Sequence, residues 1–246
     1  MMPLALLAGG SAQRIRPLSE KIPKALIEIN GRPFIDYQLE LLGSQGIEKV
    51  VLCLGYLGEI IQEYLGDGKR YGLQLQYSYD GDKPLGTGGA IKKALPLLDE
   101  RFFLLYGDSY LPIDFKSVEM AFIHSEKRCL MTVYRNKGLW DTSNVAYVAG
   151  KSQDTFGDVA CYNKNMPTSD MNYIDYGLSC LLSSEISNEK NDFFDLSDFF
   201  TRLSSGGQLA GYEVTERFYE IGSFSGIDDF SCFIKGKRFD CLSRIY

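Results

Sequence analysis

The sequence has few of the side chains from which metal sites and nucleophilic sites are commonly built. It contains a single histidine, His124, and its six cysteines form no C-x-x-C pair. A structural zinc site is therefore not expected. His124 lies in an apolar helical stretch, where a surface or hydrogen-bonded histidine is expected and a catalytic one is not. The cysteines are expected to be buried, reduced thiols, which indicates a cytoplasmic protein.

Excess positive charge and long apolar runs are also absent. The chain has 26 Lys and Arg residues against 32 Asp and Glu residues, which gives a formal net charge of −6. Such a chain has no global field that would hold it on nucleic acid, although a few local cations can still bind a small anion. No apolar run approaches the roughly 20 residues of a membrane helix, and the first residues lack the basic region of a signal peptide. Neither nucleic acid nor a membrane is expected as a partner.

The two standard nucleotide-binding motifs are missing as well. The segment Gly81–Gly86 has the glycine spacing of a P-loop, but Thr87 and Gly88 follow where lysine and serine or threonine are required. Gly86 and Gly88 begin a dinucleotide fingerprint, but Ile91 occupies the position of its last glycine. A nucleotide site in this chain must therefore be built in another way.

Hydrophobic periodicity predicts an α/β fold. In the first 110 residues, apolar strands alternate with amphipathic helices, which predicts a mostly parallel sheet with helices on both faces. The expected strands are 4–8, 50–54, 73–77 and 102–106, the helices are 34–42, 60–65 and 90–97, and a glycine loop is expected at 85–89. The inner face of the second helix is expected to consist of Ile60, Ile61, Tyr64 and Leu65. The less regular second half has expected strands at 129–134, 145–148, 159–162, 173–182, 209–214 and 218–221, and helices at 195–203, capped by Asp195, and 226–234. No linker or repeat divides the chain, so a single domain over residues 1–246 is expected.

The end of the first strand carries the first candidate site. Gly9 and Gly10 follow the apolar run, and Arg14 and Lys24 come after them. Backbone N–H groups beside two fixed cations make a cradle for a triphosphate. The same composition is also compatible with an exposed loop whose charges are simply solvated, so composition leaves both interpretations open.

The complete string of residues 7–24 favours the first interpretation. It strongly resembles the activation loop of sugar-1-phosphate nucleotidyltransferases, which reads L-A-G-G-x-G-T-R-L-x-P-L-T-x-x-x-P-K. The matching residues are Leu7, Ala8, Gly9, Gly10, Arg14, Pro17, Leu18, Pro23 and Lys24. The sequence departs from this pattern at Ala12, Gln13 and Ser19, and the first of these restricts the backbone where the family has glycine.

Later segments carry the same resemblance. Gly31–Phe34 resembles the family's helix entry, and Pro84–Ala90 resembles its base-recognition loop. Tyr106–Asp108 resembles the Gly-Asp segment that supplies a magnesium ligand. Phe218–Ser223 resembles the family's W-x-D-x-G-[T/S] segment, with Glu220 in place of the second magnesium-binding aspartate.

The resemblance implies a fold and a set of site residues. It implies a Rossmann-like three-layer α/β/α fold with a mostly parallel mixed sheet, an NTP-binding part at about 1–110 and a sugar-phosphate-binding part at about 111–246. On the same basis Arg14 and Lys24 would be catalytic, and Asp108 and Glu220 would bind Mg²⁺. The nucleotide-binding candidates are Leu7, Ala8, Gly9, Gly10, Gly86, Thr87 and Gly88, and the sugar-phosphate-binding candidates are Asn144, Lys164 and Asp175.

The implied reaction joins an NTP and a sugar 1-phosphate to give an NDP-sugar and pyrophosphate. The Pro84–Ala90 loop is most similar to the heptose- and mannose-1-phosphate guanylyltransferases that make surface polysaccharide precursors, so GTP is the first choice. CTP, UTP and dTTP stay open. The alternatives from other classes are a non-catalytic sugar-nucleotide sensor of the same fold and a generic α/β nucleotide-binding module. The oligomeric state is left open, with a homodimer among the alternatives.

Overall fold

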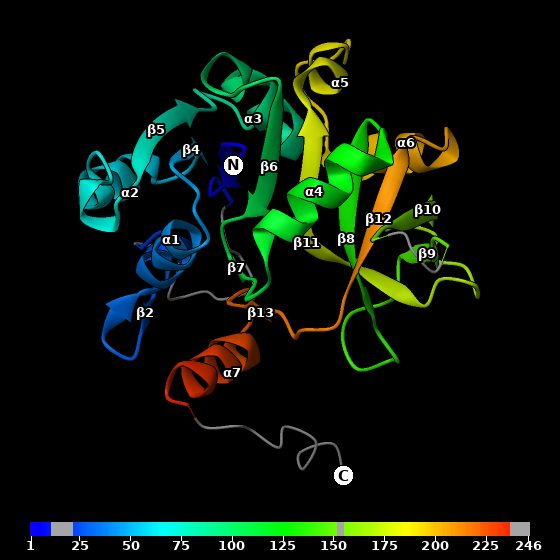
Figure 1. The fold of residues 1–246 in the computed structure, drawn as a ribbon. Helices are drawn as coiled ribbons and strands as arrows, with labels where there is room; N and C mark the ends of the chain where they lie inside the picture. Colours follow the sequence, from blue (N-terminus) through cyan, green and yellow to red (C-terminus); the bar gives the residue numbers. More distant parts are fainter. Residues whose placement is uncertain (11–21, 152–154, 237–246) are drawn as a thin grey trace.

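The computed structural model describes residues 1–10, 22–151 and 155–236, which are built around one nine-stranded sheet (Figure 1). The predicted catalytic residue Arg14 and one cysteine, Cys241, lie outside the described residues. The strand order in the sheet is β5-β4-β1-β6-β11-β8-β12-β10-β9. The strands are β1 (Leu4–Leu7), β4 (Lys49–Leu54), β5 (Gln74–Tyr79), β6 (Arg101–Tyr106), β8 (Cys129–Arg135), β9 (Val145–Val148), β10 (Gly157–Tyr162), β11 (Tyr173–Leu182) and β12 (Leu209–Val214).

The first half of the chain forms the parallel side of this sheet, in the order β5-β4-β1-β6. Strand β1 lies between β4 and β6, so that Leu6 is paired with Leu52 on one side and Leu105 on the other. All three side chains are buried, as expected for parallel strands that are covered on both faces. Strand β11 then joins β6 in the antiparallel sense, and the remaining strands make a mixture of parallel and antiparallel pairs.

Helices cover both faces of the sheet, which confirms the predicted three-layer α/β architecture. On one face α1, α2 and α4 contribute Leu39, Ile61 and Phe122 to an apolar cluster, and on the other α3 and α6 contribute Ile91 and Phe199. None of the described helices is long and apolar enough to cross a membrane. The α-helices are α1 (Phe34–Ser44), α2 (Gly58–Leu65), α3 (Gly86–Ala94), α4 (Phe115–Ser125), α5 (Ser183–Ser187), α6 (Leu196–Ser205) and α7 (Phe224–Ile234), and the 3₁₀ turns are η2 (Lys24–Leu26), η3 (Lys69–Tyr71) and η4 (Leu95–Leu97).

Two short strand pairs lie outside the main sheet. One joins β2 (Glu28–Ile29) to β3 (Arg32–Pro33), and the other joins β13 (Tyr219–Glu220) to β7 (Ser109–Tyr110). Helix α7 supports the second pair, because the ring of Phe230 lies 4.9 Å from that of Tyr110. This pair brings residues 219–220 next to the segment that follows β6.

The predicted glycine loop at 85–89 is wrong, since most of it is the first turn of α3. The backbone N–H groups of Gly88 and Gly89 both donate to the carbonyl oxygen of Phe194, which satisfies donors that the first turn of a helix leaves free. The predicted helix at 90–97 therefore begins earlier, and its last residues form η4. Contacts with a segment about 100 residues away decide this conformation.

Three smaller predictions about side chains also need correction. Ile60 was expected on the inner face of its helix but is 40% exposed, because Ile61 and Leu65 make the buried face. Asp195 occupies the N-cap position of α6, but its side chain makes no hydrogen bond to that helix. The described cysteines are free thiols, as predicted, but Cys161 and Cys232 are half-buried and not buried.

Candidate functional site

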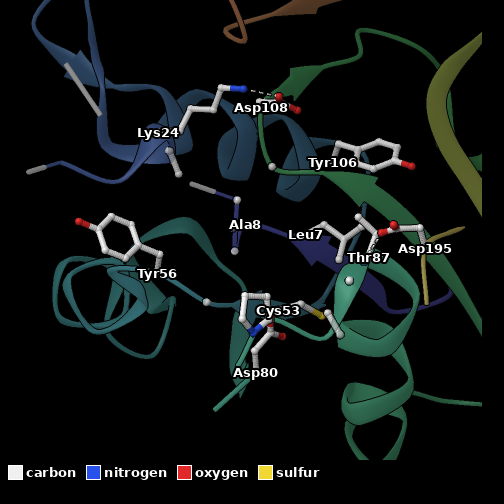
Figure 2. Close-up of a pocket in the computed structure, with 18 of the residues that line it drawn as sticks. Leu7, Ala8, Lys24, Cys53, Tyr56, Asp80, Thr87, Tyr106, Asp108 and Asp195 are labelled. Carbon is white, nitrogen blue, oxygen red and sulfur yellow. Dashed lines mark hydrogen bonds and ion pairs between the residues drawn. The ribbon is translucent and has the colours of Figure 1, made fainter. Parts of the chain in front are cut away.

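A cavity of about 630 Å³ opens at the carboxyl ends of the parallel strands, which is the edge where ligands bind in open α/β sheets (Figure 2). Its walls come from the ends of β1, β4, β5 and β6, the start of α3 and the N-cap of α6. Every described residue that was predicted to bind nucleotide lies in these walls except Gly88. The lining residues are Leu7, Ala8, Gly9, Gly10, Lys24, Ala25, Cys53, Gly55, Tyr56, Asp80, Gly81, Asp82, Pro84, Gly86, Thr87, Ala90, Tyr106, Gly107, Asp108 and Asp195.

Glycines allow the strand ends to approach one another in the cavity wall. A Cβ on Gly9 would lie 2.9 Å from the nitrogen of Gly55, and a Cβ on Gly107 would lie 2.7 Å from the carbonyl oxygen of Leu7. The N–H of Gly107 donates to that same oxygen at 2.9 Å, so sheet hydrogen bonding continues past the strand ends. This part of the wall is therefore bare backbone, to which a polyphosphate can approach closely.

Lys24 and Asp108 form an ion pair in one wall of the cavity. The Nζ atom of Lys24 lies 2.6 Å from Oδ2 of Asp108, and the two side chains are 21% and 29% exposed. Lys24 begins η2, whereas Asp108 follows β6, and the neighbouring positions of β1 and β6 in the sheet bring these two parts of the chain together. A pair that water still reaches contributes little to folding stability, so both groups remain available to a ligand.

Glu220 lies beside this ion pair because β13 pairs with β7. Glu220 is paired with Ser109, and the N–H of Ile221 donates to the carbonyl oxygen of Asp108 at 3.0 Å. Burial raises the pKa of the Glu220 carboxyl, the charge of Asp108 raises it further, and Lys24 opposes the shift. Two carboxylates that repel each other at close range form an oxygen-rich site for a cation.

Asp195 enters another wall of the cavity from the second half of the chain. Its Oδ1 atom accepts hydrogen bonds from the backbone N–H and the hydroxyl of Thr87, at 3.2 and 3.3 Å. The hydroxyl oxygen of Thr87 in turn accepts a hydrogen bond from the N–H of Leu196 at 2.9 Å. Thr87 therefore caps α6 in place of Asp195, and the Asp195 carboxylate faces the cavity, as Figure 2 shows.

Gly88 lies behind the cavity wall. It is buried in α3 beneath the ring of Phe194, and a Cβ at this position would lie 2.1 Å from a ring carbon. The close packing of α3 against the 192–195 segment explains why position 88 is a glycine, because a larger residue would clash with Phe194. The nucleotide contact that the resemblance implies for Gly88 stays a prediction.

Asp80 and Cys53 form a third part of the wall. Burial raises the pKa of the Asp80 carboxyl, which accepts a hydrogen bond from the N–H of Leu85 at 3.4 Å. Burial and the nearby charge of Asp80 raise the pKa of the Cys53 thiol to about 12. Cys53 is therefore protonated at neutral pH and is not a nucleophile.

The three candidate sugar-phosphate residues belong to a group around a bulge in β11. The side-chain oxygen of Asn144 accepts a hydrogen bond from the N–H of Asp175 at 3.1 Å, and the Asp175 carboxylate accepts one from the N–H of Gly177 at 3.0 Å. The pairing of β11 with β8 shifts here, where Gly177 has a φ of 110°. Burial raises the pKa of Asp175 to about 6, and the charge of the exposed Lys164 opposes this shift.

This group lies outside the walls of the cavity, whereas Tyr106 is one of its lining residues. Burial raises the pKa of Tyr106, and the charge of Asp175 raises it further. Asn144 also ties adjacent strands together, because its N–H donates to Tyr173 and its carbonyl oxygen accepts from Asn163. The structure therefore gives Asn144 a positioning contact with Asp175.

Sequence reasoning missed Asp80, Tyr106 and Asp195 as cavity residues. Asp80 and Tyr106 lie at the carboxyl ends of β5 and β6, the same kind of position that identified Asp108. The strand-end rule, applied to every parallel strand, would have found both. Asp195 carries no such signal, because it reaches the cavity only through packing of α6 against α3.

Within the part of the chain that the structure describes, no group of three or more His, Cys, Asp and Glu side chains could hold a metal ion. A metal at Asp108 and Glu220 would therefore take its remaining ligands from substrate and water. Mg²⁺ is commonly bound in this way, through one or two carboxylates plus phosphate oxygens.

Comparison with known proteins identifies the family of this chain. The family described as Nucleotidyl transferase matches residues 5–139, which is more than half of the chain. The chain belongs to the nucleotidyl transferase family. The matched region contains Lys24, Thr87 and Asp108 but ends before Asp195 and Glu220. Family membership therefore rests on the half of the chain that builds most of the cavity.

Individual relatives match the same half of the chain and differ in the nucleotide that their names specify. The chain is 36% identical over 129 residues to D-glycero-alpha-D-manno-heptose 1-phosphate guanylyltransferase of Campylobacter jejuni, a match covering 52% of this chain and 56% of that one. It is 33% identical over 143 residues to UTP--glucose-1-phosphate uridylyltransferase of Synechocystis, a match covering 54% of this chain and 36% of that one. The chain thus spans about half or less of the length of these relatives.

The similarity in fold extends through the second half of the chain. HddC from Yersinia pseudotuberculosis, in a structure described as complexed with GMP-PN, aligns over 96% of this chain and 100% of that one, with a TM-score of 0.72 and 23% sequence identity. At this level of identity the alignment supports the fold of residues beyond 139 and carries no residue roles.

Proposed function

We propose that this nucleotidyl transferase joins an NTP to a sugar 1-phosphate, giving an NDP-sugar and pyrophosphate. The observation that supports this most strongly is the Lys24–Asp108 pair in a cavity whose wall includes the bare backbone of Gly9, Gly10 and Gly107. Such a wall offers amide dipoles, a cation and a carboxylate suited to a metal, which together match a polyphosphate substrate.

The proposed reaction is an in-line displacement at the α-phosphorus. An oxygen of the sugar phosphate forms a P–O bond there, while the bond from the α-phosphorus to the bridging oxygen breaks and its electron pair leaves with pyrophosphate. A phosphate monoester is already anionic at neutral pH, so no general base is required. Catalysis then depends on positioning and charge neutralisation.

Two positively charged side chains of this protein would neutralise the negative charge of the phosphates. Lys24 would lie between the α-phosphate and the incoming sugar phosphate, because its ammonium group projects from the cavity wall beside Asp108. Arg14, which lies outside the described residues, would hold the triphosphate and the leaving pyrophosphate. Each charge would act on the transition state, where negative charge is spread over the phosphate oxygens.

Asp108 and Glu220 fit a Mg²⁺ ion. Both are carboxylates, the pairing of β13 with β7 places them together, and the charge of Asp108 raises the pKa of Glu220. When bound, Mg²⁺ would supply Lewis-acid neutralisation of the phosphate oxygens. Glu220 is one methylene longer than the aspartate that the family resemblance implies at this position.

The favoured form of this activity is guanylyl transfer to a heptose or mannose 1-phosphate, for surface polysaccharide precursors. The name of the Campylobacter relative and the GMP-PN ligand of the Yersinia structure support GTP. The name of the Synechocystis relative supports UTP as the alternative, and CTP and dTTP remain further choices. On this proposal residues 1–110 bind mainly the NTP, and residues 111–246 bind the sugar phosphate through Lys164 and Asp175, with Asn144 holding Asp175.

A substrate panel tests the proposal. Purified protein is incubated with Mg²⁺, each of GTP, UTP, CTP and dTTP, and a set of sugar 1-phosphates that includes heptose, mannose and glucose. Released pyrophosphate and the NDP-sugar are both measured. We expect the highest kcat/KM with GTP and a heptose or mannose 1-phosphate. Binding of nucleotide without any NDP-sugar product would instead favour the non-catalytic sensor.

A further inference from the structure

We propose that Asp195 determines nucleobase specificity in this enzyme, by accepting a hydrogen bond from the 2-amino group of guanine. The inference rests on the proposed function, because it assumes that the cavity holds the nucleotide of the transfer reaction. It adds a residue from beyond the part of the chain that matches the family, which ends at residue 139. Three observations carry it: the charges around the cavity, the contacts of Asp195, and the pattern of donors and acceptors on the bases.

The charges around the cavity decide which way a nucleotide lies. Among the described lining residues Lys24 is the sole Lys or Arg, and it lies with Asp108 in one wall. Asp80 and Asp195 are acidic groups in other parts of the wall, away from Lys24 in Figure 2. Phosphates would be repelled by these carboxylates and attracted by Lys24 and the backbone after β1. The base therefore faces Asp80, Thr87 and Asp195.

The contacts of Asp195 hold its carboxylate in one orientation. Oδ1 accepts from both the N–H and the hydroxyl of Thr87, and the same hydroxyl oxygen accepts from the N–H of Leu196. The segment is fixed further because the carbonyl oxygen of Phe194 accepts from the N–H groups of Gly88 and Gly89, at 2.9 and 3.3 Å. Oδ2 has no hydrogen-bond partner among the described residues, so it offers free acceptor capacity in the cavity wall.

The same contacts remove a donor that a pyrimidine dione would use. A helix N-terminus normally offers free N–H groups to a ligand carbonyl, but the N–H of Thr87 is already occupied by Asp195. Guanine presents an amino group and an N–H on its Watson–Crick edge, which match a carboxylate. Uracil and thymine present a single N–H between two carbonyl oxygens there, so a carboxylate that accepts from this N–H also faces the lone pairs of a carbonyl oxygen. The geometry thus favours guanine.

The test compares purine triphosphates that differ only at the 2-position. GTP carries an amino group there, inosine triphosphate carries hydrogen, and xanthosine triphosphate carries a carbonyl oxygen. Dissociation constants are measured by calorimetry with Mg²⁺ and no sugar phosphate, so that no turnover occurs. A hydrogen bond to a charged group predicts that wild-type protein binds GTP about 10- to 100-fold more tightly than inosine triphosphate.

The substitution Asp195→Asn should change this preference and leave the fold intact. The amide oxygen can keep both contacts with Thr87, while the NH₂ group replaces the free acceptor with a donor. We expect the preference for GTP over inosine triphosphate to fall to less than threefold, and xanthosine triphosphate to bind at least as tightly as GTP. Circular dichroism and thermal unfolding confirm that the variant is folded.

Two further variants make the result specific. Asp192→Asn changes an exposed carboxylate of the same segment that pairs with Lys92 outside the cavity, and it should keep the wild-type preference. Asp80→Asn changes another acidic residue of the cavity wall, and its preference for GTP over inosine triphosphate is compared with that of Asp195→Asn. Loss of that preference in Asp80→Asn but not in Asp195→Asn would overturn the assignment.

The outcomes separate this inference from the proposed function. A wild-type enzyme that makes GDP-sugar but binds GTP and inosine triphosphate within threefold of each other overturns the role of Asp195 and leaves the function standing. A wild-type protein that makes no NDP-sugar overturns the proposed activity, while a base preference that changes in Asp195→Asn still supports Asp195 as the residue that contacts the base.

Discussion

The parallel and the mixed halves of the sheet build their candidate residues in different ways. In the parallel half, four strands end at the same edge, and the residues directly after them line one cavity. In the mixed half, Asn144, Lys164 and Asp175 come from a strand entry, a loop and a bulge, which hydrogen bonds and charge draw together. Local sequence thus specifies the first group, while tertiary contacts assemble the second.

This difference has a consequence for how each half responds to substitution. Lys24 and Asp108 are half-buried and form an ion pair that water still reaches, so replacing them should change chemistry more than stability. Asp175 in the mixed half is held by hydrogen bonds, as Gly88 is held by packing where the halves meet, so replacing either residue should change stability as well. The different responses of the two halves can be compared most directly when the same substitution, such as Asp→Asn or Lys→Ala, is made in each half.

Asp108→Asn is expected to have the largest effect of all. Asparagine keeps the shape of the side chain but removes the charge that pairs with Lys24 and would bind Mg²⁺. We expect turnover to fall by about 1,000-fold or more, with thermal stability nearly unchanged. Steady-state rates over a Mg²⁺ titration check this, and unchanged saturation with Mg²⁺ would show that Asp108 is not a ligand.

Lys24→Ala and Lys164→Ala form a matched pair across the two halves. A fixed charge near a phosphoryl transition state is worth about 100-fold or more in rate, so Lys24→Ala should lower kcat by at least that factor. Lys164 is exposed, and its variant should mainly raise KM for the sugar phosphate, by about tenfold or less. Equal losses of kcat in the two variants would contradict the expectation that Lys24 acts on the transition state and Lys164 only on binding of the sugar phosphate.

Gly88→Ala tests the contact that joins the halves. The new Cβ would lie 2.1 Å from the ring of Phe194, so the ring or α3 must move. Overpacking of this kind is expected to lower the free energy of unfolding by about 1–3 kcal/mol, measured by urea denaturation. Adding Phe194→Leu makes room for the methyl group and should recover part of the loss, and a double variant no more stable than Gly88→Ala would contradict this explanation.

Asp175→Asn is expected to have the smallest effect, and one that depends on pH. Burial raises the pKa of Asp175 to about 6 from an ordinary value of 3.8, so the folded state holds the proton more tightly than the unfolded state. The carboxyl therefore stabilises the protein most below pH 4, and this contribution is lost as the pH rises to about 6. Above pH 6 the asparagine variant, which can still accept from Gly177, should be more stable than wild type by about 1–2 kcal/mol.

Thermal unfolding of both proteins between pH 4.5 and 8 checks this last prediction. The difference in melting temperature should grow as the pH rises and level off above about pH 6.5. A difference that is constant over this range would mean that the Asp175 carboxyl is ionised in the folded protein throughout.

Much of the first half follows from the sequence alone, because its signals are local. The apolar strands, the glycines at their ends and the Pro23-Lys24 step lie within short segments, and right-handed βαβ connections place such strand ends at one edge. The family resemblance of these segments implied that Lys24 and Asp108 would share a site, and their side chains lie 2.6 Å apart. The start of α3 was wrong because its first N–H groups bond to Phe194, far away in sequence.

Tertiary structure alone decided the contacts between distant residues. The position of Glu220 beside Asp108 depends on the pairing of β13 with β7, and Asp195 in the cavity depends on hydrogen bonds to a residue 108 positions earlier. A cap residue such as Asp195 has the same local pattern whether its side chain bonds its own helix or another one. Hydrophobic periodicity determines which face of an element is buried, but the choice of partner for a polar group is made only once the layers have packed.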